Sequence, residues 1–161
     1  MIEIDDVKFE QVRKTAGDEY QKIGRVYCPY LGQHVHFNNE GFEHLLFKEW
    51  NKTRTRPEQC VRLRLLRLAP QVVSKSHTMQ EFDERRMLVR QKINSRWESR
   101  ARVVRYYVFV AIINNARIKV IVKEIEGGAA FFYSLYPSWR VEKNEDGKKR
   151  KIFYSGNLES D

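Results

Sequence analysis

The stretch 103–136 reads VVRYYVFVAIINNARIKVIVKEIEGGAAFFYSLY, and it decides the fold class. It contains three runs rich in β-branched and aromatic residues, at 103–113, 117–125 and 130–136. Such residues favour strands, and the Asn and Gly pairs between the runs favour tight turns. The stretch therefore predicts three antiparallel strands in a meander. The Asn loop fits two or three residues, which leaves open the faces that Tyr106 and Tyr107 take.

Alternation along the middle run predicts which side chains share a face of this sheet. A two-residue loop at the glycine pair sets Lys119 opposite Tyr136 and Lys123 opposite Phe132. One face is then expected to carry two cations, a hydroxyl group and two aromatic rings, from Lys119, Lys123, Phe132, Ser134 and Tyr136. Such a face offers partners for the phosphate, ribose and base of a nucleotide.

Two helices are expected before the meander. Asn38 and Asn39 can cap an amphipathic run at 40–50, and Pro57 starts a second run that ends before Pro70. Residues 80–97 are rich in helix formers, with apolar residues near four-residue spacing, which indicates a partly helical segment. Short strands are expected at 7–9 and 24–27.

Helices followed by a meander predict an α+β fold, with the N-terminal helices packed on one face of an antiparallel sheet of about four strands. At 161 residues the chain fits a single domain. We expect a strand and loop extension at 1–33, the main domain at 34–140 and a charged turn or tail at 141–161. Residues 151–154 in that tail are a candidate edge strand.

Positive charge is concentrated in the middle third of the chain. The sequence holds 30 Lys and Arg against 21 Asp and Glu, a net charge of +9. Residues 52–105 hold fifteen basic and five acidic residues, and twelve of the fifteen are Arg, whose planar fork suits phosphate oxygens and base edges. This segregation indicates a polyanion such as nucleic acid as partner, and the alternative is a solvated surface laced with salt bridges.

Several classes of protein lack support in the sequence. The longest strongly apolar stretch, 106–113, is about half of what a membrane-spanning helix needs, and no secretory pattern opens the chain, so we expect a cytoplasmic protein with no membrane partner. Cys28 and Cys60 lie far apart, and His34 and His36 lack a third ligand. The Gly-rich phosphate loop, G-x-S-x-G and H-E-x-x-H motifs are missing. We expect no metal and no other cofactor.

His44 and Lys48 lie one turn apart on the first predicted helix and are candidates for chemistry. An imidazole can move a proton near neutral pH, and a cation beside it can hold a phosphate. The alternative is a His that is structural or simply exposed.

Four segments together suggest a family. They are VHFNNEGFEHLLFK at 35–48, the Arg-rich helix before Pro70, IKVIV at 118–122 and FYS at 132–134. With the tyrosine-rich strand, these resemble the phage and mobile-element branch of the barnase, EndoU, colicin and RelE-like (BECR) nucleases. The resemblance covers about 34–140 and implies helices followed by a four-stranded antiparallel sheet with an RNA-cleaving site on its open face. The chain has no late His and no obvious strand Glu for a barnase-style acid and base pair.

The resemblance also implies roles for individual residues. His44, Lys119 and Ser134 would be catalytic, in a metal-independent endoribonuclease that makes a 2′,3′-cyclic phosphate, and the protein would be a toxin or mobile-element effector. RNA contacts would come from cations and aromatic rings, at Lys48, Arg54, Arg62, Lys123, Phe132 and Tyr136. An acidic immunity or antitoxin protein would be a natural second partner, because it could fill the cationic groove.

Two other functions fit the same residues. A non-catalytic RNA- or DNA-binding module would use every basic and aromatic feature listed above, and a basic protein-interaction domain needs none of the chemistry. The nuclease hypothesis requires an uncovered sheet face on which His44, Lys119 and Ser134 converge. Covering of that face by the chain itself, or separation of the three groups, would contradict it.

Overall fold

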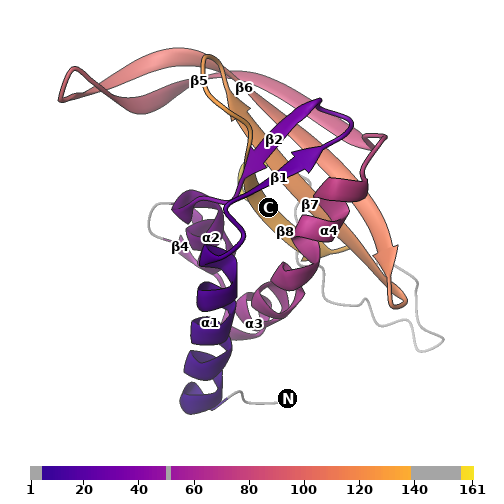
Figure 1. Cartoon of the computed structure of the whole chain (residues 1–161). Helices are drawn as coiled ribbons and strands as arrows, with labels where there is room; N and C mark the ends of the chain where they lie inside the picture. The colour runs from indigo at the N-terminus through magenta and orange to yellow at the C-terminus, as the bar shows by residue number, and fades with distance from the viewer. Residues whose placement is uncertain (1–4, 50–51, 139–156) are drawn as a thin grey trace, which may run out of the picture.

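A six-stranded sheet is the largest element of the computed structural model, which describes residues 5–49, 52–138 and 157–161. The strands lie in the order β1-β2-β8-β7-β6-β5 (Figure 1). Their bounds are β1 (Arg25–Cys28), β2 (Gln33–His36), β5 (Glu81–Ile93), β6 (Arg96–Ile113), β7 (Ala116–Ile125) and β8 (Phe131–Pro137). A separate two-stranded pair consists of β3 (Phe47–Glu49) and β4 (Lys52–Thr53). The candidate edge strand at 151–154 lies outside the described residues.

The helices precede most of the sheet in the chain. They are α1 (Asp6–Gln21), α2 (Asn39–Leu46), α3 (Arg56–Leu65), the short 3-10 helix η1 (Leu66–Leu68) and α4 (Ala69–Lys75). The predicted α+β class is confirmed, and the expected four strands are corrected to six, because the β1–β2 hairpin and β5 extend the meander on its two sides. Strands β2 and β8 pair in parallel, whereas the other neighbours in this sheet are antiparallel. Among the described helices, none has the length and apolar character needed to cross a membrane.

The predicted meander is confirmed as β6, β7 and β8. Asn114 and Asn115 both have positive φ angles, of 50° and 64°, and Ile113 pairs with Ala116. The Asn loop is therefore a two-residue turn, which suits the twist of the flanking strands. It places Tyr107 on the same face as Val122 and Tyr106 on the opposite face, with Ile121.

The prediction of a partly helical segment at 80–97 is wrong. Residues 81–93 form β5, which pairs with β6 through every position from Glu81 to Ile93. The four-residue spacing of Val89 and Ile93 also fits a strand, because four is a multiple of the two-residue strand period, whereas Trp97 lies beyond the turn, in β6. Asn94 and Ser95, with φ angles of 49° and 65°, make the turn of this hairpin. Its end projects from the body of the molecule (Figure 1).

The strand expected at 7–9 is also wrong, because α1 begins there. The Asp5 side chain accepts a hydrogen bond from the Val7 amide and caps the helix. Phe9, Ala16 and Tyr20 are buried at spacings of seven and four residues, which fit one face of a helix and not the alternation of a strand. The strand expected at 24–27 is confirmed as β1.

The predicted Asn cap is present, and the second helix has a side-chain cap as well. The Asn38 side chain accepts from the Gly41 amide at 3.1 Å, and the Thr55 hydroxyl oxygen accepts from the Glu58 amide at 3.4 Å. Helix α2 ends at Leu46, earlier than predicted, because the chain continues into β3. Pro70 does not stop the helical region but lies in the first turn of α4, where its missing N–H costs no hydrogen bond.

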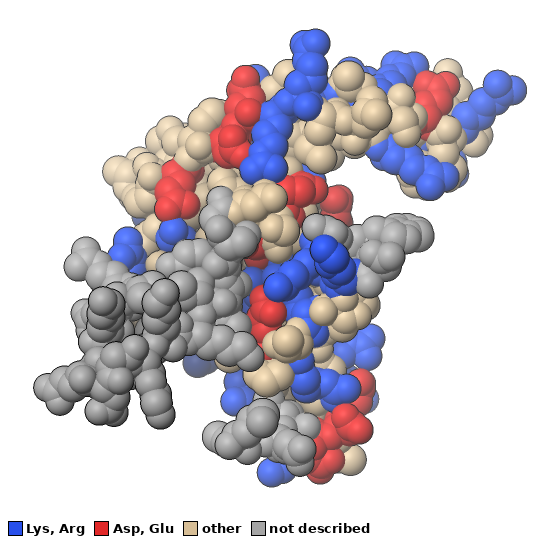
Figure 2. Space-filling view, turned by 180° about the vertical axis from the view of Figure 1, so that it is seen from behind, with Lys and Arg blue, Asp and Glu red and all other residues tan. Residues whose placement is uncertain are grey.

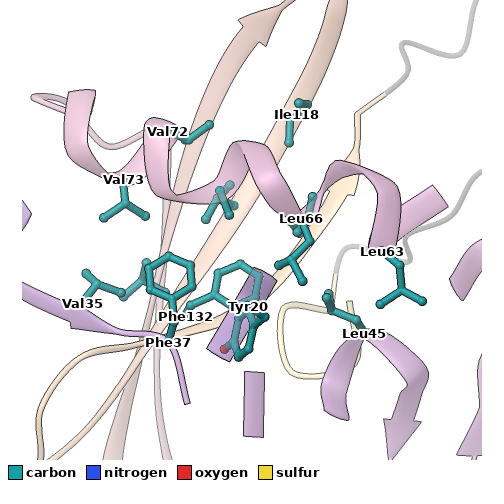
Figure 3. Close-up of a cluster of buried hydrophobic side chains, with 14 of the residues drawn as sticks. Tyr20, Val35, Phe37, Leu45, Leu63, Leu66, Val72, Val73, Ile118 and Phe132 are labelled. Atoms are coloured by element: carbon teal, nitrogen blue, oxygen red, sulfur yellow. The ribbon is translucent and has the colours of Figure 1, made fainter. Parts of the chain in front are cut away.

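The helices cover one face of the sheet, which we call the helix face, defined by Val120, Val122 and Phe132. There the Phe132 ring stacks on Phe37 with a centroid distance of 5.1 Å, next to Tyr20 (Figure 3). The opposite face, which we call the pocket face, carries a second buried cluster that includes Tyr106, Ile121, Tyr133 and Tyr136. The site described below lies on the pocket face, beside α2 and α3, both of which contact β8.

Candidate functional site

A β-bulge in β8 shapes the pocket face. Ile121 pairs with Ser134 but the next residue, Val122, pairs with Phe132, so Tyr133 is an extra residue in β8. Lys119 pairs with Tyr136 as predicted, whereas Lys123 pairs with Phe131 and not with Phe132. The prediction that Phe132 shares the face of the other candidates is therefore corrected, because its ring lies in the core on the helix face.

Two buried arginines lie beside the bulge. The fractional exposure of Arg54 is 2 % and that of Arg62 is 0 %. The Glu58 carboxylate accepts from Arg54 Nη1 at 3.0 Å and from Arg62 Nη2 at 3.2 Å. The three residues are spaced by four, which places Glu58 and Arg62 on one side of α3. Burial lowers the pKa of Arg62 to about 9, and the neighbouring Arg54 adds to the effect.

Three donor side chains converge on one oxygen atom. The main-chain oxygen of Asp161 accepts hydrogen bonds from Ser134 Oγ at 2.7 Å, from Arg54 Nη2 at 3.1 Å and from Arg62 Nη1. Arg62 Nη1 also donates to Ser134 Oγ at 2.9 Å. We call Arg54, Arg62 and Ser134 the anion pocket, because guanidinium and hydroxyl groups in this arrangement are typical partners of an anionic oxygen.

Residues 157–161 cover the pocket face at this point. Tyr133 Oη donates to the main-chain oxygen of Glu159 at 2.7 Å, and Lys123 Nζ lies 3.1 Å and 3.2 Å from its two carboxylate oxygens. Leu158 is buried in the cluster of the pocket face. The expectation of an uncovered sheet face is therefore wrong: the chain itself fills the anion pocket, and Lys119 pairs with Glu81 away from it. The open three-residue site that the nuclease hypothesis required is thus contradicted, and a nuclease at this position would need residues 157–161 to leave. Burial first, and then the Glu40 charge, raise the pKa of Glu159 to about 7.

His44 lies at the edge of the anion pocket. Its ring stacks on Tyr133 with a centroid distance of 4.0 Å and an interplanar angle of 20°. Arg54 Nη2 donates to His44 Nε2 at 3.1 Å, since a guanidinium group can only donate. Burial lowers the pKa of His44 to about 2, with further contributions from the charges of Arg54, Arg62 and Lys123. The imidazole is therefore neutral in this arrangement.

The structure brings His44, Arg54, Arg62, Lys123 and Ser134 together, with Lys48 and Tyr136 next to them, and it directs Lys119 and Phe132 elsewhere. Lys119 Nζ lies 2.6 Å from Glu81 Oε1 on β5. Tyr136 is buried below Arg62, whose guanidinium carbon lies 5.4 Å from the ring centroid. Lys48 lies 4.0 Å from Glu58 and is half-exposed. The prediction requires His44, Lys119 and Ser134 to converge. His44 and Ser134 are linked through Arg54 and the main-chain oxygen of Asp161, whereas Lys119 pairs with Glu81.

A cavity of about 590 Å³ opens beside His44. Its lining is rich in carboxylates and rings, from Glu40, Glu43, His44, Phe47, Lys48, Tyr133 and Glu159. It gives His44 and Tyr133 a route to solvent next to the anion pocket, and its size suits a nucleoside.

Three residues of the site were not predicted from the sequence. Glu58 could have been found, because it lies four residues from Arg54 and four from Arg62. Tyr133 is hidden by the bulge, since regular alternation puts it on the opposite face from Ser134. Glu159 follows β8 by more than twenty residues, and no pattern in the sequence connects it to the pocket.

Comparison of the chain with protein families, curated proteins and solved structures finds no match.

Proposed function

We propose that the chain binds an RNA phosphodiester in the anion pocket and cleaves it without a metal ion, as a BECR-type endoribonuclease. The observation that carries this proposal is the convergence of Arg54, Arg62 and Ser134 on a single oxygen atom. Buried guanidinium groups bind phosphate through paired, charge-assisted hydrogen bonds. Their positions are held by Glu58 before any ligand arrives, so little reorganisation accompanies binding.

RNA can enter only when residues 157–161 leave the pocket. The main-chain oxygen of Asp161 occupies the position proposed for a phosphate oxygen, and Glu159 occupies the position beside Lys123. A phosphodiester carries a full negative charge that can be shared by both guanidinium groups, and it therefore competes well for donors of this kind. The covered conformation would then be an inactive form of the enzyme.

The proposed reaction transfers a phosphoryl group within the RNA. The ribose 2′-oxygen bonds to phosphorus as it loses its proton, the bond from phosphorus to the 5′-oxygen breaks, and that oxygen takes up a proton. The products are a 2′,3′-cyclic phosphate and a free 5′-hydroxyl. DNA lacks the attacking hydroxyl group and would be bound but not cut.

Each residue has a role in this proposal. Arg54 and Arg62 stabilise the charge that develops on the phosphorane-like transition state, and they take the place of Lys119 in the catalytic set. Ser134 orients the phosphate. His44 moves the proton once a phosphate has drawn Arg54 away from its Nε2 and water has raised its pKa. Tyr133, whose ring already stacks on an imidazole, replaces Phe132 and Tyr136 as the partner of a base.

The test is incubation with a labelled RNA 20-mer in EDTA. We expect cleavage to a 2′,3′-cyclic phosphate, faster for a chain that ends at residue 156 than for the full chain. His44→Ala should lower the cleavage rate by about 10² to 10⁴, and Ser134→Ala by about 10². Ser74→Ala on the exposed side of α4 is the matched control and should change nothing. Circular dichroism of each variant separates loss of activity from loss of fold.

One observation favours a second candidate, a non-catalytic RNA- or DNA-binding module. Arg54 occupies the Nε2 lone pair of His44, which is the lone pair a general base would need. If this hydrogen bond persists with RNA bound, RNA stays intact with both chain lengths and shifts in a gel in a salt-dependent manner. Absence of both cleavage and a shift at low salt would contradict both candidates.

A further inference from the structure

The β5–β6 hairpin extends beyond the rest of the sheet as a two-stranded arm, which we define as residues 86–102. Strand β7 pairs with β6 only from Val104 onward, so the arm has no third strand. No residue of the arm is buried. Eight residues of β5 and seven of β6 give it a length of about 25 Å. A ribbon of two strands is marginally stable alone. Met87 and Val89 at its base pack against the buried cluster of the pocket face, but no residue from Arg90 to Arg102 packs against either buried cluster of the described chain.

The arm is strongly and asymmetrically charged. It holds six cations and one carboxylate, Glu98, which pairs with Arg100 at 3.0 Å. Lys and Arg side chains are prominent along the projection in Figure 2. Alternation places three of the cations on each face of the ribbon, Arg86, Arg90 and Lys92 on one and Arg96, Arg100 and Arg102 on the other.

The face with Arg86, Arg90 and Lys92 is the more open of the two. All three side chains are exposed, and none of them forms an ion pair within the described part of the chain. The same face carries Trp97, which is 61 % exposed, and Leu88, which is 72 % exposed. The Arg90 guanidinium carbon lies 5.3 Å from the centroid of the Trp97 ring.

Protection of a sheet edge accounts for the cations but not for the exposed ring of Trp97. Charged side chains on edge strands prevent pairing with other chains, and that alone would explain Arg90 and Lys92. An exposed Trp works against such protection, because it offers a large apolar surface. Cations interleaved with an exposed aromatic ring are what single-stranded nucleic acid binds, through its phosphates and through stacking of a base.

We infer that the arm binds the sugar-phosphate backbone of RNA outside the anion pocket, with one base stacked on Trp97. The choice of RNA over another polyanion rests on the proposed function, whereas the binding surface rests on the charge and exposure of the arm. The substrate is then an RNA much longer than the nucleotides at the pocket.

The test is fluorescence anisotropy with a 2′-O-methyl RNA 30-mer, which lacks the attacking hydroxyl group and stays intact. The arm variant R86Q/R90Q/K92Q is compared with K8Q/K14Q/K22Q, which removes three exposed cations of α1 and its C-cap and so matches it in net charge. We expect the arm variant to bind about 10²-fold more weakly at 0.1 M salt, with the slope of log Kd against log salt reduced by about 2. Trp97→Ala should weaken binding about 10-fold.

Equal affinities and equal salt slopes for the arm variant and the α1 control would overturn the inference. So would a dimer that Trp97→Ala dissociates while RNA affinity is unchanged, because the arm would then bind a second copy of the chain. Cleavage of a dinucleotide, too short to reach the arm, is measured in parallel. Arm-dependent binding without cleavage would refute the proposed nuclease activity but support the inference about the arm. Cleavage without arm-dependent binding would support the nuclease and refute the inference about the arm.

Discussion

His44 is the residue whose chemistry depends most on its surroundings. Its imidazole is buried between Tyr133 and Arg54, and protonation would add a positive charge next to two guanidinium groups. The ring is therefore held neutral, with its Nε2 lone pair occupied. In the covered pocket His44 acts as an acceptor that fixes Arg54, and it can act as a proton carrier only when Arg54 has a better acceptor.

We predict that His44 does not titrate near neutral pH in the full chain. A folded-state pKa of about 2 lies below the ordinary value of 6.5, so the imidazole stays neutral from pH 8 to pH 4. Two-dimensional NMR of the imidazole resonances measures this directly. In a chain that ends at residue 156, water enters and the midpoint should move up towards 6.5. A midpoint near 6.5 in the full chain would show that the ring is not buried as described.

At this scale the sequence predicted some residues well and others badly, for identifiable reasons. His44 could be placed because an Asn cap fixes where α2 begins, and the cap geometry is local. Arg54 and Arg62 were identified as cations, but their burial could not be foreseen, because it depends on Glu58 and on residues 157–161. The pairing of Lys119 across the sheet follows from alternation, but its ion pair with Glu81 comes from β5, whose sequence predicts a partly helical segment.

At the scale of elements, the approach of α2 to β8 positions His44. Gly41 makes this approach possible, because a Cβ atom at this position would lie 2.2 Å from the main-chain oxygen of Phe132. The Tyr20 hydroxyl donates to the main-chain oxygen of Asn38 at 2.6 Å and holds the start of the helix. The helix and the strand are thus fitted to each other at the position of the bulge.

Gly41→Ala should lower the free energy of unfolding by about 1–3 kcal/mol, because backbone must move to accept the new methyl group. Gly17→Ala in α1 is the matched control. Its Cβ would meet its nearest atom at 3.6 Å, and Ala is favoured over Gly inside a helix by about 0.5–1 kcal/mol. Urea denaturation measures both variants. A neutral Gly41→Ala would mean that α2 does not pack so closely on β8.

The elements show where sequence patterns are informative. The meander was predicted because its alternation and its turn pairs agree with each other. Strand β5 was missed because its many charged residues are good helix formers, and only pairing with β6 makes it a strand. The bulge was missed because a single extra residue leaves no mark on composition.

At the scale of the whole molecule, residues 157–161 join elements that are far apart in the chain. They contact Arg54 beside α2, Arg62 on α3, Lys123 on β7 and Tyr133 on β8. Release of this segment would therefore loosen one side of the sheet as well as open the anion pocket. No pattern in the sequence predicts this arrangement, because the contacts are non-local and involve main-chain oxygens that every residue possesses.

Two groups make the binding of residues 157–161 to the pocket depend on pH, with opposite signs. Burial raises the pKa of Glu159 from 4.5 to about 7 when the segment is in place, so this contribution favours the covered form fully below pH 4.5 and is lost as the pH rises through 7. Burial lowers the pKa of His44 from 6.5 to about 2, so this contribution favours the covered form above pH 6.5 and is lost as the pH falls. Hydrogen exchange of the 157–161 amides, corrected for intrinsic rates, should therefore change less between pH 5 and pH 8 in the wild type than in a Glu159→Gln variant.

Glu159→Gln removes the Glu159 contribution and leaves that of His44, so protection of the variant should increase from pH 5 to pH 8. Glu19→Gln on the exposed side of α1 is the matched control and should behave as the wild type does. The same pH dependence in the wild type and in Glu159→Gln would mean that the Glu159 carboxyl group does not control the segment.

The extra residue in β8 has a consequence for the molecule as a whole. In a strand without a bulge, side chains alternate between the two faces of the sheet. Tyr133 and Ser134 would then point to opposite faces, and one of them would lie on the helix face. The bulge turns both towards Arg62 and His44, so a phenol ring and a hydroxyl group become neighbours. The site thus depends on the one extra residue in β8. Deleting one residue there would restore regular alternation and remove the site, although the sequences of all helices and all other strands stay unchanged.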